Sequence, residues 1–527
     1  MLDALATQLE PRRLAVESAR VATGLAKIAA GRSDVTVPPE DQRFADPAWT
    51  LNPFYRRLAQ SYLLWAAAVD RLATSQHEDQ PDWRHEARAR YAARLLVEAA
   101  APTNLLLGNP TALKRAFDTG GASVMRGARN AVRDAVKRRG LPSQVDGDAY
   151  RVGENLATTP GAVIYREDLF ELIQYTPTTP NVRERPLLML PPQINKYYFF
   201  DLAPGRSFVE YLVDRGVQFF TVVWRNPHDG DGRWGMDDYA AAQLRAIEIV
   251  REVSGSDELG LLGVCAGGLT MGLTLGHLAA TGDLGPITSA TYAMAMIDSR
   301  YPNPLGMLAT DDALIGVAKD AAAGRVYDRG RIGRTFAWLR PDDLVFRYVV
   351  ADWLLGEEPP PFDVLAWNDD GADLSARFFH EMLDIYAYNK AATPGEVTLL
   401  GTPIDLGQVD CDSFLVCGGT DHITPWKCTY MTSELLGGST EVVVTSTGHI
   451  QTIVSPPGKP RARYVTGPVG PDPDEWMAAA SHHEGSWWPR YAGWLIARSG
   501  GEREAPAALG SARHRPLEPA PGTYVHG

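Results

Sequence analysis

The sequence predicts an α/β protein in which a mostly parallel sheet is covered by helices and preceded by a separate helical domain. Three observations predict this class. From about residue 156 onward, short apolar runs alternate with helical stretches, as in strand–helix–strand units. Before that point, apolar residues recur every three or four positions, as they do on one face of a helix. Between about residues 300 and 402, aromatic helical patterns interrupt the strands, which predicts an inserted cap or lid.

The first domain, residues 1–155, is predicted to be α-helical. Asn52-Pro53 supplies a helix start, with Asn as the cap and Pro in the first turn. Further helices are expected near Asp82–Ala100 and Pro110–Arg139. We interpret the apolar faces of these helices as surfaces for core packing or for docking onto the second domain, in preference to a binding role. The face of the helix after Asn52 consists of Phe54, Leu58, Tyr62, Trp65, Val69 and Leu72.

The second domain, residues 156–500, carries the predicted sheet. Its first two strands are close in sequence, so we expect an antiparallel hairpin at the leading edge of the sheet. A helix is expected at Asp237–Val253. The final residues, 501–527, are rich in Pro, Ala, Gly and charge, and are expected to form a flexible tail. The predicted strands are 162–165, 170–175, 186–190, 218–224, 259–264, 289–297, 413–417 and 441–445.

Composition excludes several classes of protein. The 527 residues include 51 basic and 64 acidic side chains, for a formal net charge of −13. A nucleic-acid-binding protein needs a basic footprint, and adsorption on an anionic membrane needs positive charge, so we expect neither partner. Four cysteines are too few for a disulfide scaffold, and none are spaced as a zinc pair. Residues 1–30 lack the apolar run of a signal peptide, so a cytoplasmic location is expected.

One stretch has the length of a membrane span. Residues 259–281 carry no formal charge, and 23 residues could cross a bilayer. However, six of these residues are glycines, and the two halves have the patterns of a buried strand and a small-residue helix. We therefore expect a buried strand–turn–helix unit here and no membrane span.

The turn of that unit carries the most informative motif. Residues 263–268 read Gly-Val-Cys-Ala-Gly-Gly, which fits G-x-nucleophile-x-G with Cys265 at the nucleophile position. The nucleophile of this motif lies on a sharp turn between a strand and a helix, so its flanking residues must be small. The motif predicts an α/β-hydrolase fold. Considered alone, it also fits a buried structural cysteine in a glycine-rich turn.

Two residues further along the chain favour the catalytic interpretation. In this fold an acid follows a later strand and a histidine follows the last one. Asp421 follows the predicted strand 413–417, and His449 follows the predicted strand 441–445. We therefore predict a triad of Cys265, His449 and Asp421. His422 is the rival base, but adjacent loop residues tend to point apart, so we favour His449.

The oxyanion hole is predicted to use backbone N–H groups. The first is that of Ala266, directly after the nucleophile, and the second comes from the loop after strand 186–190. That second donor is Gln193 or Ile194, and the sequence does not distinguish them. The other cysteines are interpreted as structural. No P-loop or dinucleotide motif is present in the sequence, and neither a metal ion nor a bound cofactor is expected.

Several longer motifs together resemble one family. The chain resembles the polyhydroxyalkanoate synthases, the enzymes that polymerise 3-hydroxyacyl-CoA into storage polyester. The resemblance covers most of the chain and is closest to the single-component enzymes of the medium-chain class, although that class commonly has Ser where this chain has Ala266. The matching motifs include LPPQINKYYFFDL (190–202), VWRNP (223–227), FAWLRPDD (336–343), DHITPW (421–426), GHIQTIVSPP (448–457) and GSWWP (485–489).

The resemblance implies that Cys265, Asp421 and His449 form the catalytic triad, and that the substrate is (R)-3-hydroxyacyl-CoA. CoA is then part of the substrate and a product, not a cofactor. The resemblance also implies a homodimer that works on a growing polyester chain at the surface of cytoplasmic granules. Two alternatives remain at this stage. One is a cysteine-dependent thioesterase or polyester depolymerase of the same fold, and the other is a non-catalytic scaffold protein of the granule.

Overall fold

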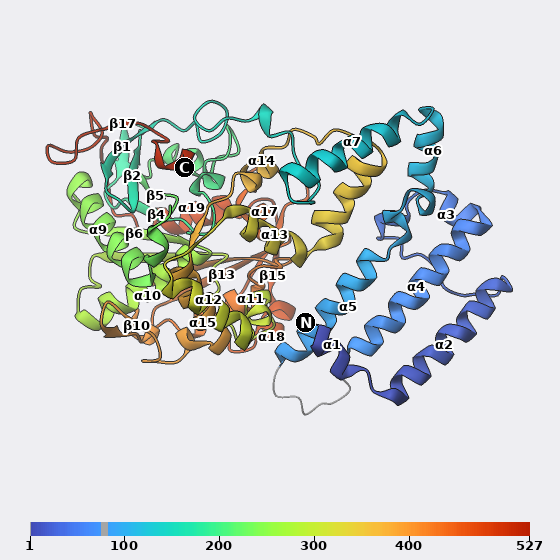
Figure 1. Ribbon diagram of the computed structural model, residues 1–527. Coiled ribbons are helices and arrows are strands. Elements are labelled where there is room, and N and C mark those ends of the chain that lie inside the picture. The colour runs from blue at the N-terminus through green and yellow to red at the C-terminus, as the bar shows by residue number, and fades with distance from the viewer. Residues whose placement is uncertain (1, 75–82) are drawn as a thin grey trace. The chain divides into compact units, whose positions relative to one another are not determined.

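A computed structural model describes residues 2–74 and 83–527 and divides the chain into two compact units (Figure 1). The helical unit comprises the residues up to Asp146 together with Gly333–Pro361. The other unit comprises Gly147–Ile332 and Phe362–Gly527, and we call it the catalytic unit because it contains the predicted triad. The domain division in the structure therefore differs from the one expected at residue 155. It also divides the expected cap, 300–402, because the middle of that segment packs with the helical unit.

Two helices of the helical unit begin directly after an asparagine that caps them. Asn52 caps α4 by accepting a hydrogen bond from the N–H of Phe54 at 2.9 Å, and Asn109 caps α6 in the same way. The predicted face of α4 is only partly buried, because Tyr62 and Leu72 are buried while Phe54 is 64% exposed. Asp82, where a helix was expected to begin, lies outside the described residues. The main helices are α1 (Leu2–Gln8), α2 (Pro11–Ala29), α3 (Ala48–Leu51), α4 (Pro53–Ala73), α5 (Trp83–Ala99), α6 (Pro110–Asp118) and α7 (Ala122–Lys137).

Segment 333–361 joins this unit through α7. Its two π-helical turns are η7 (Asp342–Phe346) and η8 (Val349–Leu354). The indole N–H of Trp353 donates to Asp134 Oδ2 at 2.9 Å, and the amide of Asn130 donates to Asp352 Oδ1 at 2.6 Å. Asp134 and Asp352 are both buried, so these hydrogen bonds stabilise polar groups that have little access to water.

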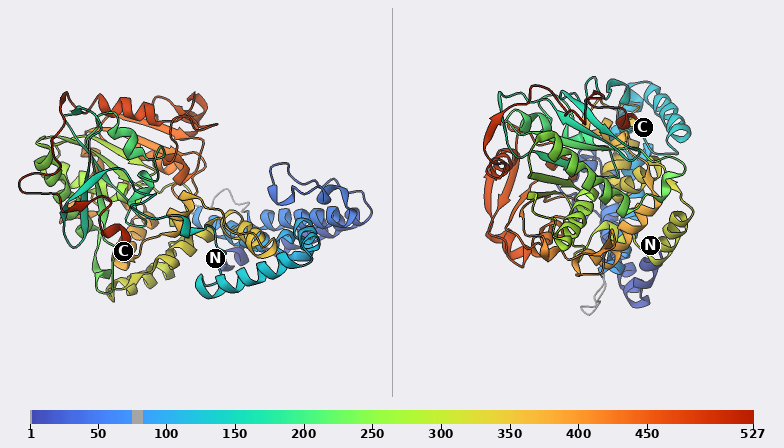
Figure 2. Two further views of the ribbon diagram at one scale, coloured as in Figure 1. Left: turned by 90° about the horizontal axis from the view of Figure 1, so that it is seen from above. Right: turned by 90° about the vertical axis from the view of Figure 1, so that its left-hand side faces the viewer.

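The catalytic unit is built on an eleven-stranded sheet with the order β15-β14-β13-β12-β7-β6-β4-β5-β2-β1-β17 (Figures 1 and 2). The strands from β13 to β5 pair in parallel, and the outer pairs are antiparallel. The expected hairpin of β1 and β2 is confirmed. The strands are β1 (Gly161–Arg166), β2 (Phe170–Tyr175), β4 (Leu187–Leu190), β5 (Phe219–Trp224), β6 (Leu259–Val264), β7 (Ile287–Ala293), β12 (Asp412–Gly418), β13 (Thr440–Thr445), β14 (Arg463–Thr466), β15 (Ser481–Glu484) and β17 (Glu518–Pro519).

Helices cover both faces of this sheet. A Cβ added at Gly260 of β6 would meet Leu495 of α19 (Trp488–Ile496), whereas one at Gly263 would meet Met271 of α10 (Ala266–Thr281). Positions an odd number of residues apart on a strand point to opposite faces, so α10 and α19 lie on opposite sides. Helix α9 (Met236–Ser254) packs beside α10. This arrangement confirms the predicted α/β class.

The uncharged stretch 259–281 folds as β6, a turn at Cys265 and α10. Among the described residues, no helix combines the length and the apolar character that crossing a membrane requires.

The tail, expected to be flexible, instead follows the edge of the sheet. Strand β17 pairs with β1, and β16 (Glu502–Glu504) pairs with β3 (Asn181–Arg183). The buried carboxylate of Glu171 accepts hydrogen bonds from the backbone N–H and the hydroxyl of Thr523. Backbone pairing and polar contacts therefore hold the tail. Because such contacts require no apolar periodicity, the sequence pattern did not indicate an ordered segment here.

Candidate active site

Cys265 lies at the sharp turn between β6 and α10. Its φ is +49°, a left-handed conformation that costs a non-glycine residue about 1–3 kcal/mol. The neighbouring glycines let the chain pass close to other strands. A Cβ at Gly267 would lie 2.4 Å from the carbonyl oxygens of Leu190 and Pro191, and one at Gly268 would lie 2.3 Å from the Ala295 Cβ. The strained turn and its crowded flanks match the geometry of a nucleophile elbow.

Asp421 and His449 come together in the loops that follow β12 and β13. Nδ1 of His449 lies 2.6 Å from Asp421 Oδ2, and both side chains are buried. The other oxygen of Asp421 accepts hydrogen bonds from the N–H groups of Ile423 at 2.8 Å and Thr424 at 3.0 Å. The hydroxyl of Thr424 donates to Oδ2 at 2.9 Å. These bonds fix the carboxylate so that it orients the ring of His449, the base favoured over His422.

The charges of this pair depend on one another. Burial by itself lowers the pKa of His449, but the Asp421 carboxylate outweighs burial, and a hydrogen bond with Cys265 adds to its effect. The resulting pKa of His449 is about 10. Burial raises the pKa of Asp421, but His449 and the two backbone N–H groups hold it below its ordinary value. The site therefore stabilises an imidazolium beside a carboxylate, and Cys265 adds to the rise in the pKa of the ring.

The loop expected to complete an oxyanion hole begins beside the elbow. Leu190, the last residue of β4, pairs with Gly263 in the sheet, so the chain that follows passes next to Cys265. Ala266 is the first residue of α10, where a backbone N–H has no carbonyl of its own helix to bond. Gln193 is buried, and its amide donates to the Thr270 hydroxyl at 3.3 Å, while Ile194 is half-buried. Both candidate donors thus lie in the loop that borders the elbow.

Polar contacts join this loop to the inserted segment, and the sequence does not predict them. We call the contacts of Asp370 with Lys196 and Tyr198 the clasp. The ammonium of Lys196 lies 2.7 Å from Asp370, and the hydroxyl of Tyr198 donates to the same carboxylate at 2.9 Å. The indole N–H of Trp367 donates to the carbonyl of Lys196 at 2.9 Å. Asp370 belongs to the run Asn-Asp-Asp-Gly-Ala-Asp, whose acidic composition alone resembles a solvated loop.

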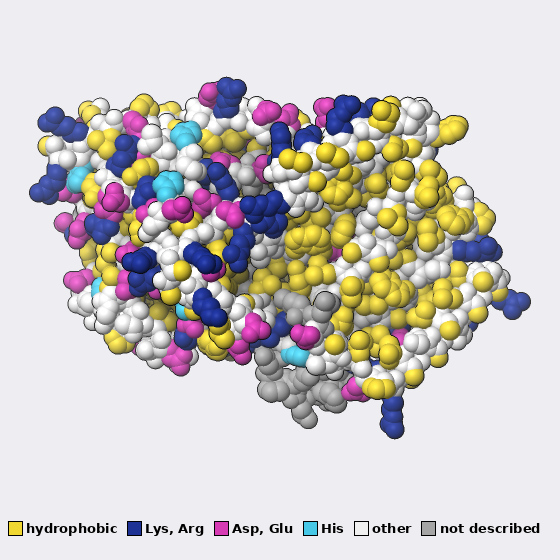
Figure 3. Space-filling model, viewed as in Figure 1, with side chains coloured by type: hydrophobic (Ala, Val, Ile, Leu, Met, Phe, Trp, Pro, Cys, Tyr) yellow, Lys and Arg dark blue, Asp and Glu magenta, His cyan; other side chains and the backbone are white. Residues whose placement is uncertain are grey.

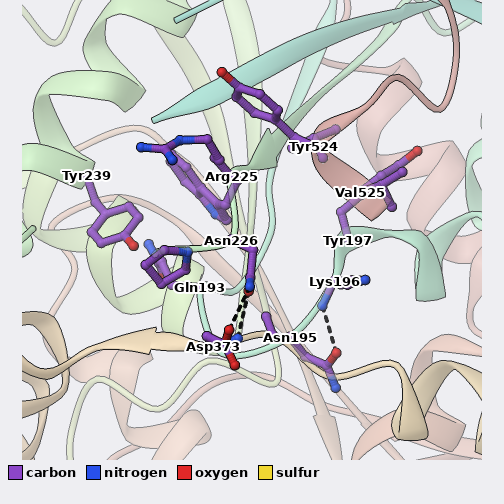
Figure 4. A pocket seen from close by; sticks show the side chains of 14 residues that line it. Gln193, Asn195, Lys196, Tyr197, Arg225, Asn226, Tyr239, Asp373, Tyr524 and Val525 are labelled. Atoms are coloured by element: carbon purple, nitrogen blue, oxygen red, sulfur yellow. Dashed lines mark hydrogen bonds between the residues drawn. The ribbon is translucent and has the colours of Figure 1, made fainter. Parts of the chain in front are cut away.

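Figure 4 shows a small pocket that Lys196 also lines, where Asn226 and Asp373 face each other across two hydrogen bonds of 2.8 and 2.7 Å. The pocket is lined by the loop that contains Gln193, by the end of β5 and by the last residues of the chain, including Tyr524. Cys265, Asp421 and His449 are not among its lining residues. In the described part of the chain, no group of three His, Cys, Asp or Glu side chains could hold a metal ion.

The sheet and the turn between β6 and α10 define a protein of the α/β-hydrolase fold, with Cys265 at the motif position where enzymes of this fold carry their nucleophile. Two solved structures align with part of the chain at low sequence identity. A monoacylglycerol lipase from Paleococcus ferrophilus matches 63% of this chain and all of its own at 13% identity, with a TM-score of 0.35. An alpha/beta fold family hydrolase from Bacillus anthracis str. Sterne matches 56% of this chain and 94% of its own at 14% identity, with a TM-score of 0.33.

Relatives that match over nearly the whole chain specify the family. A family model described as the N-terminus of poly-beta-hydroxybutyrate polymerase (PhaC) matches residues 40–212. Poly(3-hydroxyalkanoate) polymerase 2 of Ectopseudomonas oleovorans is 43% identical over 95% of this chain and 89% of its own length. The poly(3-hydroxyalkanoate) polymerase subunit PhaC of Cupriavidus necator is 39% identical over 94% of this chain and 85% of its own. The chain belongs to the poly(3-hydroxyalkanoate) polymerase family, which confirms the resemblance found in its motifs.

Proposed function

We propose that this protein polymerises (R)-3-hydroxyacyl-CoA into polyester and releases CoA, with Cys265, His449 and Asp421 as its catalytic triad. The observation that carries the proposal is the buried 2.6 Å contact of His449 with Asp421, beside a cysteine held on a strained turn. Curated relatives that span most of the chain are named as polymerases of this polyester, which supports the reaction class.

In the loading step, His449 takes the proton of the Cys265 thiol. The thiolate attacks the carbonyl carbon of the acyl-CoA thioester, and the tetrahedral oxyanion accepts hydrogen bonds from the N–H of Ala266 and from one N–H of the Gln193–Ile194 loop. The carbon–sulfur bond to CoA then breaks, and the CoA sulfur receives the proton from His449. The enzyme thioester that forms is similar in energy to the CoA thioester that is consumed. The acyl-enzyme therefore persists until a second acyl unit reacts with it.

In the elongation step, the hydroxyl of a second acyl unit gives its proton to His449 and its oxygen attacks the enzyme thioester. An ester bond forms, and Cys265 leaves as a thiolate and recovers its proton. Asp421 has been assigned this second base role in the family. Here both of its oxygens already accept hydrogen bonds and its side chain is buried, so we assign the proton transfer in both steps to His449.

Exclusion of water decides between polymer and free acid, because water would hydrolyse the acyl-enzyme. The part of the insertion that remains in the catalytic unit is the cover we propose. The clasp of Asp370 with Lys196 and Tyr198 ties that cover to the loop beside the elbow. We further propose that CoA enters only as part of the substrate, with no separate cofactor, and that the active form is a homodimer at the surface of cytoplasmic polyester granules.

The test is an assay with (R)-3-hydroxyacyl-CoA that measures released CoA, insoluble polyester and free 3-hydroxy acid. The proposal expects CoA and polyester in matching amounts. Cys265→Ala is expected to lower the rate of CoA release by at least about 10³-fold, since the nucleophile is lost. Cys411→Ala is the matched control, because burial raises the pKa of Cys411 to about 12 and its thiol has no part in the proposed chemistry.

The two alternatives predict different products. Free 3-hydroxy acid as the main product would identify a thioesterase or depolymerase. A granule scaffold requires that the wild-type protein releases no CoA, or that Cys265→Ala releases it at the wild-type rate while granule binding changes.

A further inference from the structure

The helix that carries His449 is only one turn long. Helix α17 spans His449–Ile453, and the chain leaves the helical conformation at Val454. The last carbonyl groups of a helix have no N–H partner within it, and so short a helix has little stability of its own. The position of the His449 ring therefore depends on the groups that bond to α17 from outside.

Side chains from outside the helix bond the carbonyl groups at its end. Each of the five successive carbonyl oxygens of residues 451–455 accepts a hydrogen bond from a side chain. Three of these bonds run from the Trp487 indole to Thr452 at 2.7 Å, from the Trp488 indole to Ile453 at 3.0 Å and from the Lys459 ammonium to Val454 at 2.8 Å. A helix too short to be stable alone is therefore held by its neighbours.

The rings of Trp487 and Trp488 are themselves fixed. The surface of the catalytic unit that Figure 3 shows mixes charged and apolar side chains, but these two indoles are buried and each is 1% exposed. The ring centroid of Phe208 lies 5.4 Å from that of Trp487 and 5.1 Å from that of Trp488. Trp487 also stacks on Phe414 of β12, the strand that leads to Asp421. The same rings therefore connect α17 with the strand of the triad acid.

Thr452 links the end of α17 to its start. Its carbonyl oxygen accepts the bond from Trp487, and its hydroxyl donates to the carbonyl of Gly448 at 2.8 Å. Gly448 directly precedes His449, whose Nδ1 lies 2.6 Å from Asp421. A displacement of Thr452 would therefore be passed to Gly448 and would change the contact between the base and its acid.

Packing of the rings alone does not explain the pair of tryptophans. A phenylalanine ring would fill most of the same space, but an indole N–H is a hydrogen-bond donor, and both N–H groups are used by carbonyls of α17. Because Thr452 is buried, its carbonyl oxygen would lose a bond that water does not readily replace. The hydrogen bonds can therefore be tested separately from the packing.

We propose that Trp487 and Trp488 are positioning residues that hold His449 against Asp421 by hydrogen-bonding the end of α17. This inference rests on the proposed function, because it takes His449 as the base. Both residues act through the helix, since its carbonyl groups use their indole N–H groups. The inference also gives a task to the motif GSWWP (485–489), which the proposed mechanism does not use.

The test compares the full-length wild type with Trp487→Phe/Trp488→Phe, which keeps two aromatic rings and removes both N–H groups. The kcat for CoA release from (R)-3-hydroxyacyl-CoA is expected to fall at least about tenfold, since small displacements of a catalytic group are costly. KM is expected to change by less than about twofold, because the lost bonds orient the base and do not bind substrate. The short hydrogen bond between His449 and Asp421 gives a low-field proton NMR resonance, which is expected to broaden or disappear in the variant.

Trp476→Phe is the matched control. The indole of Trp476 donates to the carbonyl of Gly467 at 3.1 Å, and the side chain is 5% exposed. The substitution therefore removes the same kind of buried hydrogen bond but leaves the end of α17 intact. It is expected to keep the low-field resonance and a kcat within about twofold of the wild type. Should the double variant not fold, Trp487→Phe alone carries the comparison, with an expected fall in kcat of about threefold to tenfold for one hydrogen bond.

Three results would overturn the proposal. The first is a folded double variant that has the kcat and the low-field resonance of the wild type. The second is an equal loss of kcat in Trp476→Phe, which would trace the effect to general stability. The third is a rise in KM without a change in kcat, which would place the indoles in substrate binding. A wild type that releases no CoA would contradict the proposed function, and the NMR comparison would still decide whether the indoles position His449.

Discussion

Asp421 and His449 show how one buried contact sets the charge of a site. The Asp421 carboxylate overcomes the effect of burial on the His449 ring and raises its pKa to about 10. A histidine whose pKa is raised on folding stabilises the folded state fully below its unfolded pKa of about 6.5, and this contribution is lost as the pH rises through about 10. Asp421, whose pKa is lowered, contributes above about pH 4 and loses its contribution as the pH falls. The contact is therefore most stabilising between about pH 4 and 6.5.

This dependence gives a prediction for Asp421→Asn. We expect it to lower the free energy of unfolding by about 3 kcal/mol at pH 6, as loss of one member of a buried pair does, and by much less at pH 10. CoA release is expected to fall by about 10³-fold, because a neutral amide neither stabilises the imidazolium nor fixes its tautomer. Urea unfolding at the two pH values and the CoA assay measure the two effects. An equal loss of stability at pH 6 and pH 10 would contradict the assigned electrostatics.

The sequence could predict the partners of Cys265 because chain order and strand ends specify them. In a parallel sheet the carboxyl ends of neighbouring strands lie along one edge, so Asp421 after β12 and His449 after β13 had to approach each other. It could not predict the clasp of Lys196 with Asp370, because those residues are 174 positions apart and acidic loops are usually solvated. Nor could the sequence choose between Gln193 and Ile194 as the second oxyanion donor, because residue type does not determine the direction in which a backbone N–H points.

At the scale of elements, the elbow depends on the contact between the start of α10 and the end of β4. Gly267 lies directly against the carbonyl oxygens of Leu190 and Pro191, which are backbone atoms that cannot rotate away. Gly267→Ala is expected to lower the free energy of unfolding of the catalytic unit by about 3 kcal/mol, the upper range for overpacking. It should also displace the loop beside Cys265 and reduce CoA release.

A matched control exists in the same unit. Gly493 lies within helix α19, and a Cβ there would meet no atom within 4 Å. Gly493→Ala is expected to leave activity unchanged and to raise stability by up to about 1 kcal/mol, since alanine favours helices over glycine. Equal effects of the two substitutions in thermal unfolding would show that the close approach at Gly267 is not what holds the elbow.

The elements that sequence patterns missed are short or polar. β14 and β15 extend the sheet beyond β13, but β15 reads Ser-His-His-Glu and has no apolar alternation. The aromatic pattern of 333–361 predicts helices, but it does not separate this segment from its neighbours in the expected cap. Periodicity tells which side of a helix is apolar but not what covers it.

At the scale of the whole molecule, the chain crosses between its two units more than once, but the units have separate cores. One cluster, around Trp49 and Tyr62, lies entirely within the helical unit. The large cluster that surrounds β6 and α10 lies entirely within the catalytic unit. Units with separate cores behave as separate cooperative blocks when the chain unfolds. We therefore expect two transitions in calorimetry of the wild-type protein.

Gly127→Ala tests this expectation. Its Cβ would meet the Trp353 carbonyl oxygen at 1.8 Å, so α7 must move away from segment 349–357 and lose the hydrogen bond of Asn130 with Asp352. We expect a loss of about 3 kcal/mol confined to the helical unit. One calorimetric transition should move down by several degrees, the other should stay in place, and the initial rate of CoA release should remain within twofold.

Gly333→Ala is the matched control, because this helical glycine has no atom within 4 Å of its added Cβ. It is expected to leave both transitions near their wild-type temperatures. A single transition that shifts as a whole in Gly127→Ala would mean that the two cores unfold together. The segment 333–361 would then couple the units energetically, and a substitution on the helical unit would weaken the catalytic unit through the chain connections at Gly333 and Pro361.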